Sequence, residues 1–210
     1  MFNTENGIKN MNRFLIIINI FFITSIFGQS SYSGKIIYEI KINKQKVKSY
    51  KSSESRKKMD KKIRSAIDKM YSSSTIEEGE LSFNQQESVY SLVNSIRNGE
   101  NGGINLVKNL AGGNNLFYAN SSIKKNTEQN CELLGECFLI ENPVLKWELK
   151  QATKIIGSYV CYQAVSMKEY KGRKSYVVAW YTPQIPVNFG PKNYNGLPGL
   201  ILELERGDII

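Results

Sequence analysis

Proline constrains the C-terminal quarter of this chain more than any other feature of the sequence. Four of the five prolines fall within residues 183–198: Pro183, Pro186, Pro191 and Pro198. Each proline fixes its φ angle and removes a backbone donor, so this segment is neither a helix nor a central strand. Three glycines in the same segment can adopt positive φ: Gly190, Gly196 and Gly199. We therefore expect a stiff, ordered loop, here called the Pro/Gly loop.

Short runs of alternating apolar and polar residues predict β-strands on both sides of a polar middle region. Tyr38, Ile40 and Ile42 alternate in the first run. The expected strands are 34–43, a short one at Leu81 and Phe83, 88–93, 116–119, 137–141, 146–150, 159–167, 174–181 and 200–205. Residues 98–115 are rich in Gly and Asn and predict a surface loop. The predicted fold is mainly β (α+β), an antiparallel curved sheet or partly open barrel with one amphipathic helix.

The N-terminus predicts export. Lys9 and Arg13 precede an unbroken apolar run, residues 14–27, which ends at Gly28. This is the pattern of a signal peptide, and the run is shorter than the roughly 20 apolar residues that a membrane-spanning helix needs. We expect a signal peptide at 1–28 and a single β-rich domain at 29–210. The expected location is the periplasm or the outer membrane, or the medium after secretion.

The net charge of +9 is concentrated in one segment. Residues 35–69 hold thirteen Lys and Arg against four acids, whereas the chain from Met70 onward is nearly neutral. Five apolar residues at helical spacing predict an amphipathic helix over 55–71, inside a basic insertion at about 46–71: Met59, Ile63, Ala66, Ile67 and Met70. Such a helix either packs by this stripe onto the domain, which we favour, or lies on an anionic membrane surface. No aromatic residues interleave with the basic run, which disfavours nucleic acid.

The three cysteines favour one disulfide and one buried thiol. Cys131 and Cys137 flank a short turn and are the expected disulfide pair in an oxidising compartment. Cys161 lies in an apolar alternating stretch, and a core position is favoured there over a reactive thiol. The spacing lacks paired metal knuckles and the chain has no histidine, so no metal site and no cofactor are expected.

One hexapeptide carries a family resemblance. Residues 196–201 read Gly-Leu-Pro-Gly-Leu-Ile, and the chain resembles the GLPGLI family, which is named for this motif. Residues 179–186, the Gly190-Pro191 and Gly172-Arg173 pairs and a stretch around Trp147 and Cys161 match the same pattern in order and spacing. The resemblance implies secreted proteins of Bacteroidota-type bacteria with no established activity. Members usually continue with further strands, so the end at Ile209 and Ile210 suggests a C-terminally truncated version.

Catalysis is the less favoured function. The absence of histidine excludes the Ser-His-Asp and Cys-His constellations. Glu141, Glu148, Glu203 and Glu205 lie on expected strands, where solvated strand faces explain them. The alternative that stays open is a periplasmic hydrolase acting through carboxylates or Cys161.

The leading hypothesis is a non-catalytic binding module for an apolar ligand or a protein partner of the envelope. Aromatic and proline-rich loops held on a stiff sheet suit recognition, because little conformational freedom is lost on binding. The equally weighted alternative is that these residues plug one end of the sheet. The candidate binding residues are Trp180, Tyr181, Pro183, Ile185, Pro186, Gly190, Pro191, Gly196, Leu197, Pro198 and Gly199, with Phe189 and Tyr194 beside them.

Overall fold

The structure is a computed structural model. It describes residues 32–93, 105–131, 136–170, 173–207 and 209–210. The chain divides into two compact units, Met1–Ser31 and Tyr32–Ile210. The predicted signal peptide and the start of the mature chain lie outside the described residues.

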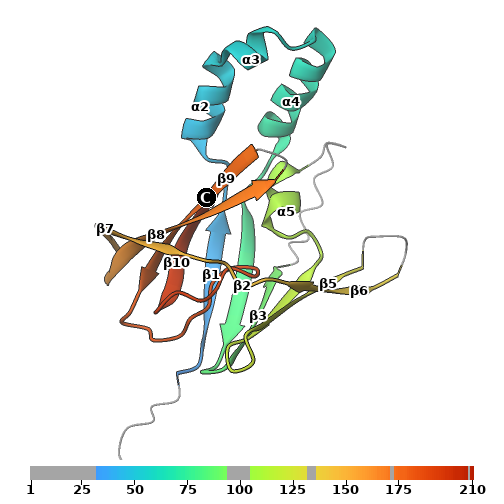
Figure 1. The fold of residues 1–210 in the computed structure, drawn as a ribbon. Coiled ribbons are helices and arrows are strands. Elements are labelled where there is room, and N and C mark those ends of the chain that lie inside the picture. Colours follow the sequence, from blue (N-terminus) through green and yellow to red (C-terminus); the bar gives the residue numbers. More distant parts are fainter. Residues whose placement is uncertain (1–31, 94–104, 132–135, 171–172, 208) are drawn as a thin grey trace, which may run out of the picture. The chain divides into compact units, whose positions relative to one another are not determined.

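The larger sheet is a six-stranded antiparallel meander in the order β1-β2-β3-β4-β5-β6 (Figure 1). Each strand pairs with the next along the chain, so β1 and β6 form its edges. Its strands are β1 (Gly34–Ile40), β2 (Glu77–Phe83), β3 (Glu87–Leu92), β4 (Leu116–Asn120), β5 (Lys125–Asn130) and β6 (Phe138–Asn142).

The smaller sheet has four antiparallel strands in the order β10-β9-β8-β7. The strands are β7 (Glu148–Ile156), β8 (Tyr159–Tyr170), β9 (Arg173–Thr182) and β10 (Leu200–Arg206). The Pro/Gly loop connects β9 to β10, which pair with a register shift between Ile201 and Glu203. The fold-class prediction is confirmed at the level of a β-rich protein with antiparallel sheets, and the two sheets do not close into a barrel.

Alternation explains which face of the larger sheet is buried. Tyr38 and Ile40 of β1 point inward, as do Leu81 of β2 and Tyr90 of β3. Gly79 lies opposite the Tyr90 ring, and a Cβ there would come within 2.3 Å of the Tyr90 hydroxyl. A glycine in β2 therefore makes room for the Tyr90 side chain.

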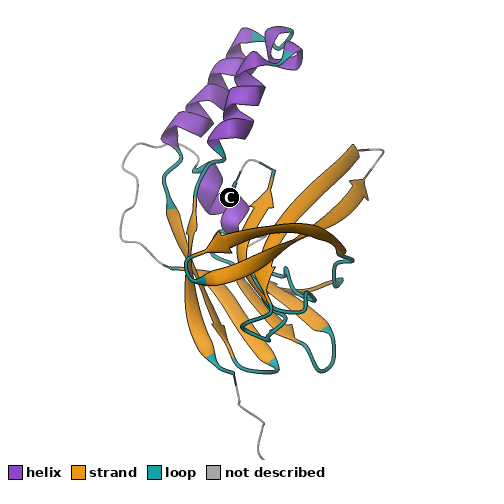
Figure 2. Cartoon of the chain, turned by 90° about the vertical axis from the view of Figure 1, so that its left-hand side faces the viewer, coloured by secondary structure: helices purple, strands orange, loops and turns teal. Residues whose placement is uncertain are grey.

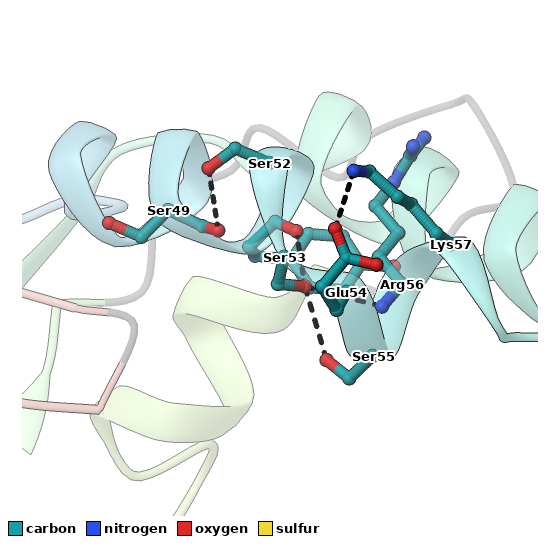
Figure 3. A network of polar contacts seen from close by, with 8 residues as sticks. Ser49, Ser52, Ser53, Glu54, Ser55, Arg56 and Lys57 are labelled. Atoms are coloured by element: carbon teal, nitrogen blue, oxygen red, sulfur yellow. Dashed lines mark hydrogen bonds and ion pairs between the residues drawn. The ribbon is translucent and has the colours of Figure 1, made fainter.

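Between β1 and β2 the chain leaves the sheet as a helical hairpin, formed by α2 (Lys44–Ser52), α3 (Glu54–Lys57) and α4 (Lys61–Ser73). The prediction of one helix over 55–71 is therefore wrong in its boundaries. Asn43, Ser53 and Asp60 each accept hydrogen bonds from the backbone of the following turn and start a new helix. Figure 3 shows the α2–α3 corner, where the Ser53 hydroxyl accepts from the Arg56 backbone amide.

The apolar stripe of this segment does not cover a sheet. None of the residues in α2, α3 and α4 is buried, and Ile63 is 55% exposed. The helices pack on each other instead, through the Tyr50 and Tyr71 rings at 5.5 Å and an Arg56–Asp68 ion pair at 2.6 Å. In Figures 1 and 2 the hairpin extends beyond the ends of β1 and β2. Within the described residues no helix is long and apolar enough to cross a bilayer.

A different, unpredicted helix covers the larger sheet. Residues of the expected Gly/Asn loop form α5 (Leu106–Ala111), which buries Val107 and Ala111 against the core. The Tyr90 hydroxyl donates to the Ala111 carbonyl at its C-terminal end. The loop prediction is thus wrong for 106–111, because a helix of six residues is too short to repeat its apolar spacing. Strand β5 was also missed, since its sequence is entirely polar.

Candidate functional site

The Pro/Gly loop lies between the two sheets and contributes to both cores. Val187 and Phe189 belong to the core of the larger sheet, whereas Tyr194 and Leu197 belong to that of the smaller one. Backbone hydrogen bonds fold the loop on itself, with Leu200 N donating to Ile185 O at 3.0 Å and Ile201 N donating to Phe189 O at 2.9 Å. This geometry fits the expectation of a stiff loop. The loop, however, lies between the two sheets and not at one end of a single sheet.

Two polar contacts fix the middle of the loop to its surroundings. Trp147 Nε1 donates to the Asn195 carbonyl at 2.8 Å. The Asn195 side chain pairs with the buried Asn126 of β5. Burial of two amides is tolerated because each satisfies the other. The loop is thereby attached both to the larger sheet and to the segment that precedes β7.

The predicted binding residues do not form one surface. Tyr181, Gly190, Pro191, Leu197 and Gly199 are buried. The exposed members are Pro183, Pro186, Gly196 and Pro198, while Trp180 and Ile185 are half-buried.

Trp180 and Tyr181 lie on opposite faces of β9 because strand side chains alternate. Tyr181 enters the core of the smaller sheet. Trp180 faces outward, where Lys154 Nζ lies 4.3 Å from its ring centroid and also 2.5 Å from the Glu203 carboxylate. Strand alternation in the sequence alone predicts that Trp180 and Tyr181 point to opposite faces.

Close packing explains two of the loop glycines. A Cβ on Gly199 would lie 2.2 Å from the Thr182 carbonyl oxygen, and one on Gly190 would lie 2.7 Å from the Tyr194 carbonyl oxygen. Gly196 has a φ of 89°, in the region that favours glycine. The expectation of positive φ does not hold at Gly190, where space is the constraint.

Among the groups named for the hydrolase alternative, Cys161 and Glu203 both lie beside Lys154, which is the cross-strand partner of Cys161. Cys161 is fully buried, and burial raises the pKa of its thiol, so the nucleophilic thiolate is disfavoured. Glu203 is paired with Lys154, and Glu148 is paired with Lys150. Cys131 and Cys137 are joined by a disulfide beside β6. Within the described ranges, no three His, Cys, Asp or Glu side chains gather as metal ligands.

A cleft opens between β1 and β10, the facing edges of the two sheets. Its volume is about 280 Å³, near the lower end for ligand pockets. We call it the seam cleft. Most of its lining is apolar, with four charged residues among the apolar ones: Ile36, Ile37, Tyr38, Glu39, Ile40, Lys41, Tyr90, Ala111, Pro191, Lys192, Leu202, Glu203, Leu204, Ile209 and Ile210.

Tyr38 joins the two walls of the seam cleft. Its hydroxyl donates to the Ile201 carbonyl at 2.6 Å, from β1 to β10. Burial, and secondly the nearby Tyr90, raises the pKa of Tyr38 well above its ordinary range, so the phenol stays protonated. Pro191 is the one predicted binding residue that lines the cleft.

The chain beyond β10 closes one end of the seam cleft. Arg206 and Ile209 exchange backbone hydrogen bonds at 3.1 and 3.2 Å across a tight turn. Lys41 and Ile210 exchange another pair, each at 3.0 Å, and Ile42 lies opposite Ile209. Residues 209–210 thus pair with β10 on one side and with the end of β1 on the other. The sequence predicts strand β1 from its alternation and shows that residues 209–210 are apolar. It does not predict that these two segments contact each other.

A family model described as "Protein of unknown function (Porph_ging)" matches residues 172–203, which include most of β9, the Pro/Gly loop and the start of β10. A comparison with curated proteins finds no match.

Two solved structures share a distant likeness with the chain. "Structure of PNGF-II in C2 space group" is 12% identical, with a TM-score of 0.48, over 83% of this chain and 25% of that one. "Structure of PNGF-II in P21 space group" is 13% identical, with a TM-score of 0.44, over 63% of this chain and 23% of that one. The chain therefore spans about a quarter of the length of these proteins.

Proposed function

We propose that this is an exported envelope protein of the GLPGLI type. It binds an apolar ligand or a protein partner and does not catalyse a reaction. The observation that carries the proposal is the seam cleft, where apolar side chains from two sheet edges surround an open volume. Apolar walls with a few polar groups at the rim are the usual character of a ligand site. The Pro/Gly loop contributes Pro191 and Lys192 to the lining of this cleft.

The loop acts as scaffold in this proposal. Its aromatic residues stabilise the two cores, and its backbone hydrogen bonds hold β10 in place. A wall held this firmly loses little freedom when a ligand enters. The binding role expected for the loop residues is therefore transferred to the neighbouring cleft.

A hydrophobic fluorescent dye tests the binding site. The mature chain should bind 1-anilinonaphthalene-8-sulfonate with increased emission, and Leu202→Glu should weaken the affinity about tenfold, equivalent to about 1.4 kcal/mol. Ile155→Glu is the matched control, because Ile155 is 74% exposed on β7 and does not line the cleft. Equal loss in both variants, or none in either, would contradict a site at the seam.

Export is tested separately. Protein recovered from the periplasm or the medium should start at Gln29 by N-terminal sequencing. An intact N-terminus on cytosolic protein would remove the envelope from the proposal.

The helical hairpin supports a second binding role, on an anionic membrane surface. Eleven Lys and Arg against three acids lie in residues 44–73, and all nine of these lysines are exposed. Such a cluster attracts anionic lipid by roughly 1 kcal/mol per basic residue near the surface. Vesicles of phosphatidylglycerol should co-sediment with the protein at low salt, and phosphatidylcholine vesicles should not. Replacing Lys57, Lys58, Lys61 and Lys62 with Gln should abolish this, and binding that persists would contradict the role.

A further inference from the structure

A second cavity lies at the base of the helical hairpin. Its volume is about 550 Å³, within the usual range for ligand pockets, and we call it the hairpin pocket. Figure 1 shows α2 and α4 as two legs that reach the end of β1 and the start of β2. Residues of both legs line the pocket, together with residues of the two segments that join the legs to the strands.

Part of the lining of the hairpin pocket is apolar. Ile42 follows β1, Ile76 precedes β2, and both line the pocket. Val47 of α2 and Tyr71 of α4 add apolar surface from the two legs. Ile76 is 61% exposed, and its transfer out of water would be favourable. The pocket therefore has room and apolar surface for a hydrocarbon group.

The α2 wall of the hairpin pocket is cationic. α2 contains four lysines and no acid, and two of these lysines, Lys44 and Lys51, line the pocket together with Val47. The three positions are spaced by three and four residues, so their side chains lie on one face of the helix. In the part of the chain that the structure describes, neither Lys44 nor Lys51 forms an ion pair.

The acids that line the hairpin pocket are already paired with other cations. Glu39 lies 2.8 Å from the Lys41 ammonium, and Asp68 lies 2.6 Å from the Arg56 guanidinium. These acids therefore do not compensate the two lining ammonium groups of α2. The first turn of α2 also lacks an acid, so the positive end of the helix dipole adds to the same potential. The pocket combines uncompensated positive charge with apolar surface.

We propose that the hairpin pocket binds an anionic amphiphile, a molecule with an acidic head and an alkyl chain. The head lies at Lys44 and Lys51, because charge-assisted hydrogen bonds to an anion are the strong ones. The chain covers Ile42, Val47 and Ile76, which removes apolar surface from water. The site is separate from the seam cleft, so the inference goes beyond the proposed function and does not depend on it.

Calorimetry with octyl phosphate, below its micelle concentration, tests the inference. The mature chain should bind this probe at one site. Octanol and inorganic phosphate should each bind at least about tenfold more weakly, because each supplies only one of the two kinds of contact. Equal affinity for inorganic phosphate would leave a simple anion site, and equal affinity for octanol would remove the role of the lysines. Either result would overturn the amphiphile.

Two double variants of α2 separate the pocket from the overall charge of the hairpin. Lys44→Gln with Lys51→Gln removes both lining charges, whereas Lys46→Gln with Lys48→Gln removes two charges of the same helix that do not line the pocket. Octyl phosphate should bind about tenfold more weakly to the first variant and less than about threefold more weakly to the second. Equal losses would show attraction to net charge alone and overturn the pocket. No residue of α2 is buried, and circular dichroism checks that both variants are folded.

Two isoleucine variants test the contact with the alkyl chain. Ile76 and Ile123 both lie outside the helices and strands, and they are 61% and 66% exposed. Only Ile76 lines the pocket. Ile76→Ser should weaken octyl phosphate binding at least about fivefold, and Ile123→Ser should not change it. Equal affinities of the two variants would contradict an alkyl chain in this pocket.

A bilayer lipid and a free alkyl phosphate or fatty acid share this chemistry, and vesicles distinguish the two sources. Competition between phosphatidylglycerol vesicles and octyl phosphate would assign the pocket to a bilayer lipid. Absence of competition would assign it to a free amphiphile. Both results retain the pocket.

The Leu202→Glu variant keeps this inference distinguishable from the proposed function. If that variant loses octyl phosphate binding while the Lys44→Gln, Lys51→Gln variant retains it, the amphiphile binds in the seam cleft and the hairpin pocket is overturned. If dye binding shows no dependence on Leu202 but octyl phosphate binding depends on Lys44 and Lys51, the seam cleft is overturned and the hairpin pocket stands.

Discussion

Asn126 of β5 and Asn195 of the Pro/Gly loop donate side-chain hydrogen bonds to each other, each Nδ2 to the other's Oδ1, in the buried interior. This contact links the larger sheet to the loop across 69 residues of sequence. It accounts for a polar residue in the least apolar strand of that sheet. The pair holds the loop at a depth where neither amide meets water.

The losses of unfolding free energy caused by removing the two members of this pair should not be additive. Each single variant should lose more than half of what the double variant loses. Asn195→Ala leaves the Asn126 amide buried without its partner, which costs about 1–3 kcal/mol. The double variant with Asn126→Ala should lose clearly less than the sum of the two single variants. Urea unfolding of the four proteins measures this, and simple additivity would show that the pair is not coupled.

Substitution by alanine should reduce the stability of the protein much more at Gly199 than at its neighbour Pro198. Gly199→Ala places a Cβ against the Thr182 carbonyl, and overpacking of this kind costs about 3 kcal/mol. Pro198 is exposed, so Pro198→Ala should cost less than about 1 kcal/mol, mainly through the unfolded chain. Thermal melting compares the two. A larger loss of stability in Pro198→Ala than in Gly199→Ala would show that the proline, and not the close packing of the glycine, stabilises the motif.

Alkaline pH should destabilise the fold through Tyr38 and Tyr90. Burial raises the pKa of both phenols, so the folded state keeps protons that the unfolded chain releases above about pH 10. Their contribution is complete below that pH and is lost as pH rises further. Urea midpoints between pH 8 and 11.5 should therefore fall at the upper end. Tyr38→Phe should fall less steeply, although it starts lower because the bond to Ile201 is lost.

The Cys161 thiol should be protected in the native protein. It is fully buried and its pKa is raised, so both access and thiolate fraction are low. Modification by 5,5′-dithiobis(2-nitrobenzoic acid) at pH 8 should be about a hundredfold slower than in guanidinium, because opening must precede reaction. Rapid labelling of the folded protein would revive a reactive role for this residue.

The strands were predictable where one face is buried, because alternation then appears in the sequence. Tyr38 and Ile40 carry that signal in β1, and both are buried. β5 gives no such signal, since Asn126 is its buried residue and the remaining residues are polar. Tertiary contact with the loop, not propensity, makes that segment a strand.

The position of the Pro/Gly loop was beyond the reach of sequence patterns. Prolines indicate stiffness at a site, but which core receives Phe189 and which receives Leu197 depends on how two separate sheets meet. The seam cleft has the same origin. Its walls were both expected as strands, yet their proximity depends on contacts more than 160 residues apart, such as Tyr38 with Ile201.

The helical hairpin can be regarded as a removable module. The chain departs after Ile40 and returns at Glu77, and these two residues are direct cross-strand partners. Since none of the residues in α2, α3 and α4 is buried, replacing residues 44–73 with a short turn would take no side chain out of either core and would keep Ile42, which packs on the larger one. Natural variation is therefore free to resize, recharge or exchange this appendage while the sandwiched interior stays the same.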